Sequence, residues 1–290
     1  MNNYHTHTFR CKHASGDVAD YVREAKKAGL SELGFSDHVP FPDGRWPENR
    51  MHIDELPSYL NAIKSAQKAE GLFAEGPIDE VSTPNSPDTP KASGRVRILA
   101  GMECEWVPEF DAWFREELLG TSGLDYLVCG THSSLSNGAW EDVWDLDSVG
   151  GLRAYAAQVE RSLASGLFAF IAHPDLFCAG YLPWDDDAIA CARDVLAAAV
   201  ATRTPVEING YGMRKPRVHG PTGPRWPYPR WEFWELARDY DLDVIVNSDA
   251  HRAIDVGASL ETGRSLAADC GLRVVEELAI SPVLEGAFRS

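Results

Sequence analysis

Seven short apolar runs recur along the chain, separated by longer segments with the periodicity of amphipathic helices. The runs occupy residues 4–8, 33–36, 98–103, 126–130, 169–172, 206–209 and 244–247. Continuous rather than alternating hydrophobicity is typical of parallel strands that are covered on both faces. The alternation therefore predicts an α/β protein with a parallel sheet wrapped by helices, built either as layers or as a barrel.

The helical segments carry their own boundary signals. Residues 17–29 place apolar side chains on one face, with Asp17 suited to cap the start and Gly29 to end the helix. A second helix is expected to begin near Asp54. Further helices are expected over residues 148–165, 189–202, 231–240 and 260–270.

Composition restricts the partners of the chain. Its 27 Lys and Arg residues against 44 Asp and Glu residues give a formal net charge of −17. Sequence-independent binding of nucleic acid or of an anionic membrane needs an excess of basic residues, so neither partner is expected. No segment approaches the roughly 18 to 20 apolar residues of a membrane span, and the N-terminal residues lack an apolar signal region. We expect a cytoplasmic protein, and the sequence leaves the oligomeric state open.

We expect residues 1–290 to form a single domain. Residues 75–95 interrupt the β/α rhythm with four prolines and almost no apolar side chains, which predicts a flexible surface insertion. The six cysteines are scattered without a C-x-x-C pair, so we interpret most of them as small buried side chains rather than a disulfide scaffold or zinc ribbon.

The nine histidines are concentrated where the predicted strands end. His5 and His7 lie in the first run, and the other candidates follow later runs, often beside carboxylates. These are His38 with Asp37, Glu103 with Glu105, His132, His173 with Asp175, and His251 with Asp249. Because the carboxyl ends of parallel strands converge on one face, we expect these side chains to meet there.

A convergence of imidazoles and carboxylates predicts a metal centre. Residues at i and i+2 of a strand point the same way, so His5 and His7 suit one ion. The number of imidazoles exceeds what one ion uses, which implies two or three divalent ions of zinc, manganese or iron. Three residues have competing interpretations. Cys11 is interpreted as a packing residue rather than a ligand and His52 as a surface residue, while His219 suits a substrate contact or simple exposure equally.

The motif set resembles the polymerase and histidinol phosphatase (PHP) superfamily, and within it the histidinol-phosphatase branch. The resemblance covers residues 4 to about 270. It rests on H-T-H-T from His5, F-S-D-H ending at His38, G-x-E at Glu103, G-T-H at His132, A-H-P-D from Ala172, E-I-N-G-Y-G-x-R-K-P from Glu207, and S-D-A-H ending at His251.

The resemblance implies a distorted (β/α)7 TIM-like barrel, in agreement with the seven runs. It also implies nine metal ligands: His5, His7, His13, His38, Glu103, His132, His173, Asp249 and His251. By the family pattern, the first ion would take His5, His7, Glu103 and Asp249, and Glu103 would bridge to a second ion held by His132 and His173. The third ion would take His13, His38 and His251.

Such a centre suits hydrolysis of a small phosphorylated substrate by a metal-bridging hydroxide. Arg214 and Lys215, which follow the sixth run, are the predicted phosphate-binding residues, with His219 as a further candidate substrate contact. His38, Asp249 or a metal-bound water are candidates to protonate the leaving oxygen. By resemblance, the substrate would be L-histidinol phosphate, an intermediate of histidine biosynthesis. Another sugar or nucleotide phosphate, a phosphodiester, and a non-catalytic metal-stabilised module are the alternatives.

Overall fold

The computed structural model describes residues 1–71, 94–136 and 138–280 of the chain. The insertion expected at residues 75–95 lies outside the described residues except for its last two positions. Among the residues that are described, no helix is both long enough and apolar enough to span a membrane.

The main sheet contains eight parallel strands, which follow the order β1-β2-β3-β4-β7-β8-β11-β12. Their bounds are Asn2–Asn3 (β1), Glu32–His38 (β2), Arg97–Cys104 (β3), Tyr126–Cys129 (β4), Phe170–Ile171 (β7), Val206–Asn209 (β8), Asp243–Asn247 (β11) and Arg273–Val274 (β12). Two small antiparallel hairpins lie outside this sheet. They pair Ser133–Ser136 (β5) with Ala139–Asp142 (β6), and Val218–Gly220 (β9) with Gly223–Arg225 (β10).

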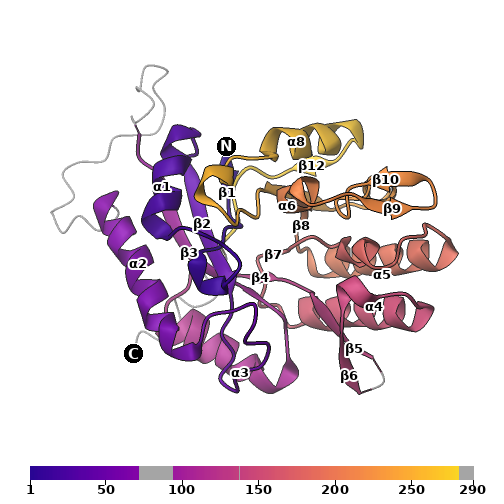
Figure 1. Ribbon diagram of the computed structural model, residues 1–290, viewed down its shortest axis with the longest axis horizontal. Coiled ribbons are helices and arrows are strands. Elements are labelled where there is room, and N and C mark those ends of the chain that lie inside the picture. The colour runs from indigo at the N-terminus through magenta and orange to yellow at the C-terminus, as the bar shows by residue number, and fades with distance from the viewer. Residues whose placement is uncertain (72–93, 137, 281–290) are drawn as a thin grey trace.

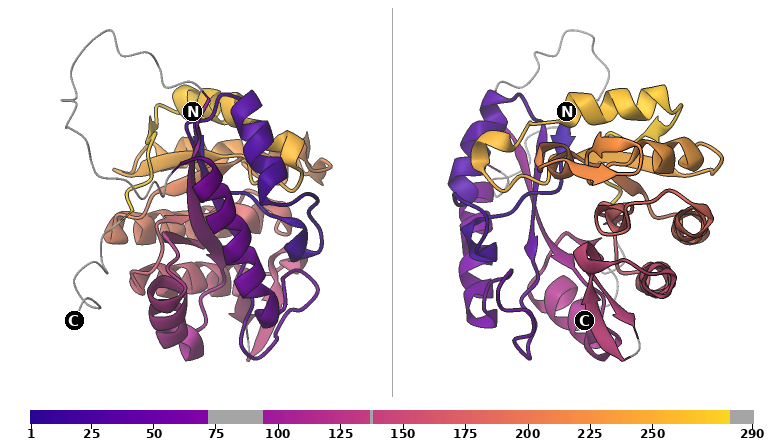
Figure 2. Two further views of the ribbon diagram at one scale, coloured as in Figure 1. Left: turned by 90° about the vertical axis from the view of Figure 1, so that its left-hand side faces the viewer. Right: turned by 45° about the vertical axis from the view of Figure 1, so that its right-hand side comes forward.

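Helices pack around the outside of the curled sheet, with α1 and α2 on one side and α4 and α5 on the opposite side (Figures 1 and 2). Their bounds are Val18–Lys27 (α1), Leu56–Ala69 (α2), Asp111–Trp113 (α3), Val149–Ala164 (α4), Asp186–Thr202 (α5), Gly210–Arg214 (α6), Trp231–Ala237 (α7) and Leu260–Asp269 (α8). A π-helix over Phe114–Thr121 continues α3. The fold is a distorted TIM-like α/β barrel, as predicted.

Capping residues explain where several helices begin. The Asp17 side chain caps α1 and forms a reciprocal capping box with Asp20, and Ser148 caps α4 by accepting from the Gly151 amide. All six helices predicted from the sequence are present, within a few residues at each end. The sequence did not predict α3, α6 or the two hairpins.

Two strand predictions need correction. The first strand covers only Asn2–Asn3, because the residues after it make single contacts with two neighbours rather than a continuous ladder with β2. The Thr6 main-chain oxygen accepts from the Ser36 N–H at 3.0 Å, and Thr6 also forms an isolated parallel bridge with Ala250. An eighth strand, β12, is also present. β12 pairs with Asp243 and Val244 at the amino end of β11, whereas Thr6 pairs with Ala250, just beyond its carboxyl end. Two different segments therefore cover this edge of β11. The barrel therefore closes irregularly.

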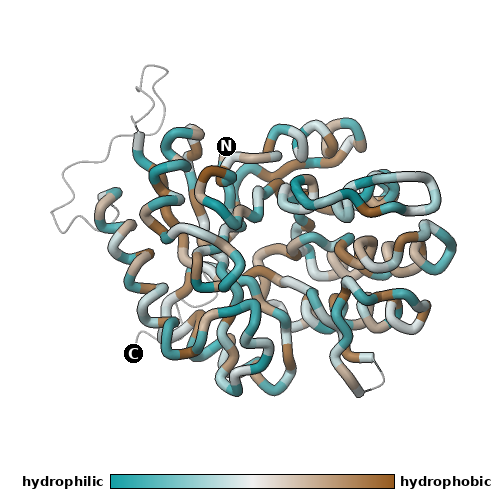
Figure 3. The backbone as a smooth tube through the Cα atoms, viewed as in Figure 1, coloured by the Kyte–Doolittle hydropathy of each residue, from teal (hydrophilic) through white to brown (hydrophobic). Residues whose placement is uncertain are grey.

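Apolar side chains form two clusters, one on each face of the sheet. Tyr4, Leu99, Tyr126, Val128, Phe170, Ala172, Ile245 and Leu278 form the smaller cluster. The larger cluster packs the helices against the outer face of the sheet. In Figure 3 the outer helices alternate between hydrophilic and hydrophobic colours, as expected for helices with one buried face.

Tyr126 occupies space that two glycines leave free inside the barrel. Its hydroxyl donates to the main-chain oxygens of Tyr4, at 2.7 Å, and Phe35, at 3.3 Å, linking β4 to β2 and to the residue that follows β1. A Cβ atom on Gly101 would lie only 2.5 to 2.8 Å from three atoms of the Tyr126 ring, and one on Gly34 would also overlap it. Glycine at these strand positions makes room for the tyrosine.

We therefore expect Gly101→Ala to lower the free energy of unfolding by about 1–3 kcal/mol, because the added methyl group must displace the buried tyrosine. Urea denaturation at fixed metal content measures this change. Gly150→Ala in α4 is the matched control, since its Cβ would meet only the Ser148 hydroxyl, at 3.9 Å. Equal destabilisation by the two substitutions would contradict this account of Tyr126.

Candidate functional site

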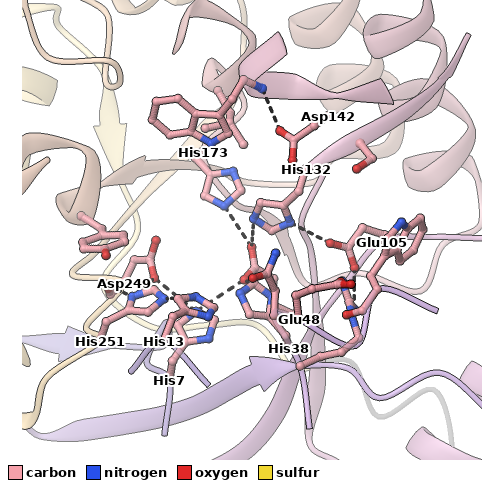
Figure 4. A pocket seen from close by; sticks show the side chains of 18 of the residues that line it. His7, His13, His38, Glu48, Glu105, His132, Asp142, His173, Asp249 and His251 are labelled. Carbon is pink, nitrogen blue, oxygen red and sulfur yellow. Dashed lines mark hydrogen bonds and ion pairs between the residues drawn. The ribbon is translucent and has the colours of Figure 1, made fainter. Parts of the chain in front are cut away.

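The carboxyl ends of the strands surround a cavity of about 340 Å³ (Figure 4). Eight of the nine predicted metal ligands line it: His7, His13, His38, Glu103, His132, His173, Asp249 and His251. The ninth, His5, is fully buried behind them, with its Nε2 3.1 Å from that of His7. The structure thus brings together residues that are separated by up to 246 positions in the sequence.

The first predicted ligand group has the spacing of atoms around a metal ion. The Nε2 atoms of His5 and His7 lie 3.3 and 3.4 Å from Oε2 of Glu103, and 3.6 and 3.2 Å from Oδ1 of Asp249. Four ligands at zinc-like bond lengths of about 2.0–2.1 Å would be separated from one another by about 3.3–3.4 Å. This donor set fits a tetrahedral ion.

Glu103 also faces a second group of ligands. Its other oxygen, Oε1, lies 2.9 Å from Nε2 of His173 and 3.4 Å from Nε2 of His132. The two carboxylate oxygens are therefore directed at different pairs of histidines, as a bridging carboxylate requires. The side chain is only 1% exposed, so these contacts are made out of water.

The third predicted group is only partly assembled. His13 and His251 approach each other with their Nε2 atoms 2.9 Å apart. His38 lies between this pair and the first group, because its Nδ1 is 3.2 Å from Oε2 of Glu103 and its ring centroid is 5.4 Å from that of His13. In the part of the chain that is described, buried atoms including His38 Nδ1 and Asp249 Oδ1 have no hydrogen-bond partner. Buried nitrogen and oxygen atoms without a hydrogen-bond partner are free to coordinate a cation.

The pKa shifts of the ligands indicate that a bound metal ion would replace protons on the histidines. Burial alone would raise the pKa of Glu103, but His132, His5 and His38 lower it well below its usual value. Burial alone would lower the pKa of His5, yet Glu207, Asp249 and Glu103 raise it well above its usual value. Protons on imidazoles thus balance the buried carboxylates, and metal binding would release them.

Three further buried carboxylates orient ligand histidines from behind. Glu207 lies 2.8 Å from Nδ1 of His5, and Glu105 lies 2.8 Å from Nδ1 of His132. Asp37 is more distant, at 3.6 Å from Nδ1 of His7. Such partners fix the ring orientation and raise the basicity of a coordinating imidazole.

Glu207 contacts three further residues of the site besides His5. Oε1 also accepts from the Asn247 side chain at 2.9 Å, and Oε2 accepts from the main-chain N–H of His173 and from the Asn209 side chain. The Asn209 side chain donates to Asp249 as well. Sequence reasoning did not assign Glu207 a role, although a carboxylate within a buried parallel strand is itself a signal.

Glu105 is held by Arg50, another residue that the sequence did not identify. The buried Arg50 guanidinium donates to Glu105 at 3.0 Å and to the main-chain oxygen of Val39. Burial alone would raise the pKa of Glu105, but Arg50 and His132 lower it to about 2. Glu105 is therefore ionised and accepts a hydrogen bond from His132.

Backbone geometry at the ligands is unusual. His173 and Asp249 have φ values of 31° and 47°, in the sparsely populated left-handed region. A Cβ on Gly130 would lie 2.5 Å from Oε1 of Glu103, so only glycine leaves room for that carboxylate. Strained positions of this kind persist where the surrounding structure fixes them, and they are concentrated at functional sites.

The three predicted substrate-binding residues are separated in the structure. Lys215 lines the cavity, with Nζ 4.2 Å from the ring centroid of Tyr211. The Arg214 guanidinium instead donates to the main-chain oxygens of Ser248, at 2.8 Å, and Asp249, at 3.3 Å. His219 is exposed in β9 and is not among the residues that line the cavity.

The predicted roles of the six cysteines and of His52 can also be compared with the structure. All six cysteines are buried and free. Cys11 has its sulfur within 4.8 Å of candidate ligand atoms of His13 and His251, so its packing role stays a prediction. His52 is exposed in the loop before α2, as predicted.

The walls of the cavity come from segments that the sequence did not identify. They include Trp46, Glu48 and Asn49 from the loop after β2, Asp142 and Trp144 from the β5–β6 hairpin and the turn that follows it, and Tyr228. These residues have no periodic pattern and become neighbours only through the tertiary structure.

Comparisons with known proteins agree with this site. The family model described as PHP domain matches residues 3–210. A Deinococcus radiodurans protein named "Probable histidinol-phosphatase" is 30% identical over 285 residues, covering 93% of this chain and 94% of that protein. The histidinol-phosphatase of Bacillus subtilis is 24% identical over 285 residues, covering 89% and 96%.

A solved structure has the same fold. Histidinol phosphate phosphatase from Lactococcus lactis, crystallised with zinc, L-histidinol and phosphate, superposes with a TM-score of 0.65 at 15% identity. The superposition covers 94% of this chain and 95% of that one.

Removing the charge of Glu207 tests how far the site depends on this carboxylate. We expect Glu207→Gln to lower metal affinity by about 10- to 100-fold, because the amide removes the negative charge beside His5 and one of the two acceptor oxygens that hold the site together. Competition with a chromophoric chelator measures the affinity. Glu261→Gln, at an exposed position in the first turn of α8, is the control and should leave it unchanged. Unchanged affinity in a folded Glu207→Gln protein would show that Glu207 does not support the ligands.

Proposed function

Because the chain belongs to the PHP domain family, we propose that it is a metal-dependent phosphoric monoester hydrolase that converts L-histidinol phosphate to L-histidinol and phosphate. The observation that carries the proposal is the group of His5, His7, Glu103 and Asp249, whose donor atoms have metal-ligand spacing. The substrate follows from the histidinol-phosphatases that resemble nearly the whole chain.

The nine ligands are proposed to hold two or three divalent ions of zinc, manganese or iron. His5, His7, Glu103 and Asp249 would hold the first. His132 and His173 would share Glu103 to hold the second, and His13 and His251, with His38, would hold the third. Metal ions held in this way polarise phosphoryl oxygens and supply a nucleophilic hydroxide at neutral pH.

Two cationic side chains in the cavity, those of Lys215 and Arg50, are proposed to bind the phosphoryl group. Lys215 lines the cavity, and within the described ranges its ammonium group forms no ion pair. Arg50 lines the same cavity beside Glu105. Arg214 is proposed to act indirectly, by holding the main chain at Ser248 and Asp249. We leave the exposed His219 out of the proposed site.

In a state in which it does not coordinate the third ion, His38 is the preferred proton donor to the leaving oxygen. Both carboxylate oxygens of the alternative, Asp249, are already engaged: Oδ1 faces His5 and His7, and Oδ2 accepts from Asn209. His38 lines the cavity, and among the described residues Glu103 is the one carboxylate within ion-pair distance of it.

We also propose that residues 1–290 form one domain, since strands from residue 2 to residue 274 join a single sheet.

A substrate panel tests the proposed function. We expect the metal-loaded protein to show its highest kcat/KM on L-histidinol phosphate, compared with sugar phosphates, nucleotides and a phosphodiester. Chelation should abolish activity and added Zn²⁺, Mn²⁺ or Fe²⁺ should restore it, because every step needs the ions. A higher kcat/KM on an unrelated phosphate would reject this substrate.

The role of His38 predicts a dependence on the leaving group. His38→Asn should lower kcat on L-histidinol phosphate by about 10²- to 10⁴-fold, because an alkoxide needs a proton as it leaves. The loss on p-nitrophenyl phosphate should be much smaller, since p-nitrophenolate leaves without one. Metal content, measured in parallel, separates this effect from loss of an ion. Equal losses on both substrates at unchanged metal content would rule out the donor role.

A further inference from the structure

We propose that Glu48 and Asp142 form an acidic rim that binds the cationic organic part of the substrate and thereby selects phosphomonoesters with a positively charged leaving group. The proposal rests on the proposed phosphatase function and adds a recognition element to it. Both carboxylates line the same cavity as the metal ligands (Figure 4).

The fold places Asp142 next to a metal ligand. In the β5–β6 hairpin Asp142 pairs with Ser133, the residue that follows His132, and Ser133 also lines the cavity. The next residue, Val143, donates its N–H to the main-chain oxygen of His132 at 2.9 Å. Asp142 is therefore held close to the second ligand group by backbone hydrogen bonds on both sides.

Glu48 reaches the same rim from the loop after β2. This loop is anchored by Arg50, which donates to Glu105, the carboxylate that orients His132. The indole of Trp46 in the loop packs edge-on against that of Trp140 in the hairpin, with ring centroids 5.3 Å apart. The loop and the hairpin thus form one continuous wall of the cavity.

Neither carboxylate is neutralised by a cation of the protein. Within residues 1–71, 94–136 and 138–280, no Lys, Arg or His lies within ion-pair distance of Glu48 or Asp142. One oxygen of Asp142 accepts from the Trp144 N–H at 2.9 Å, which is a capping contact with a neutral group. Both side chains are exposed at the cavity mouth and keep their negative charge available to a ligand.

Aromatic faces stand beside these carboxylates. Trp144 is 43% exposed although it is a large apolar residue, and it lies against Tyr228 at the cavity wall, with the Lys215 ammonium 5.3 Å from its ring centroid. Indole and phenol faces attract cations and stack on planar rings. Exposed carboxylates next to aromatic faces therefore suit a small ligand that carries a cation beside a planar ring, which describes the ammonium and imidazole groups of L-histidinol.

The negative charge of the rim explains how it would select among phosphorylated substrates. Two uncompensated carboxylates repel the phosphate dianion and any further anionic group, so they disfavour nucleotides and sugar bisphosphates. In a substrate with a cationic organic part, the attraction between that part and the rim offsets the repulsion between the rim and the phosphate. The rim would contribute specificity rather than chemistry, because neither side chain is a metal ligand.

Neutral isosteres test the proposal. We expect Glu48→Gln and Asp142→Asn each to lower kcat/KM on L-histidinol phosphate by about fivefold, mainly through KM, and the double variant by about 20-fold. Asparagine caps a turn as well as aspartate does, so Asp142→Asn removes charge without removing the cap. Activity on p-nitrophenyl phosphate, which has no cationic group, should stay the same or rise.

Asp145→Asn provides the matched control. Asp145 is exposed in the same turn but does not line the cavity, so this variant should behave as wild type on both substrates. Metal content should be unchanged in every variant. If the double variant keeps the wild-type ratio of kcat/KM on L-histidinol phosphate to that on p-nitrophenyl phosphate, the rim does not recognise the cation.

Product inhibition separates this inference from the proposed function. L-Histidinol should inhibit hydrolysis of p-nitrophenyl phosphate by the wild type, and at least 10-fold more weakly in the double variant. A panel in which another phosphate is preferred would reject the proposed function, yet weaker inhibition in the double variant would still support the rim. Equal inhibition of the two proteins would overturn the rim whatever the preferred substrate.

Discussion

Glu103 is the side chain on which the rest of the site depends. Its carboxylate is buried, and its two oxygens face different histidines: Oε2 faces His5, His7 and His38, and Oε1 faces His132 and His173. A buried carboxylate is costly unless cations or hydrogen bonds compensate it. The surrounding structure provides the required geometry: β3 brings the side chain to the cavity, and Gly130 at the end of β4 leaves the space that its Oε1 occupies. The ligands can then lie on different strands and still meet around one group.

The same network links catalysis to stability. Carboxylates behind the ligands are themselves held by the fold, Glu207 by Asn209 and Asn247, and Glu105 by Arg50. The bond to Asn247 joins the neighbouring strands β8 and β11, and the bond to Arg50 joins the loop after β2 to the end of β3. The fold therefore fixes the positions of both carboxylates. The cost is a set of crowded charges and the strained backbone at His173 and Asp249, which divalent ions would offset.

Much of this arrangement follows from the sequence, for a simple reason. Parallel strands place their carboxyl ends on one face, and residues that follow buried runs are then brought together whatever their separation in sequence. This predicted a parallel α/β fold and the meeting of ligands that follow its strands, whereas the barrel and the full set of nine ligands followed from the resemblance to the PHP superfamily. It could not predict β12, whose two residues, Arg273 and Val274, have no apolar pattern and pair only because the edge of β11 is open.

Side-chain partners were harder to predict than positions. Arg214 was predicted from its residue type and its place after a strand, but its guanidinium contacts main-chain oxygens that only the folded chain brings near. Lys215, one residue later, lines the cavity. Glu48 and Asp142 carry no motif at all, since their significance depends on a loop and a hairpin packing through two indoles.

The acidity of the chain, with a net charge of −17, is compatible with an anionic substrate because charge is distributed unevenly inside the cavity. Without ions, protons on imidazoles balance Glu103 and Asp249 at its wall, so no excess of positive charge attracts a phosphate dianion. Divalent ions would make that end positive, since bound ions are the largest local charges. The mouth would stay negative through Glu48 and Asp142. A ligand fits both ends only if it carries phosphate at one end and positive charge at the other, so metal binding must come first and the dipolar shape of the substrate then decides its orientation.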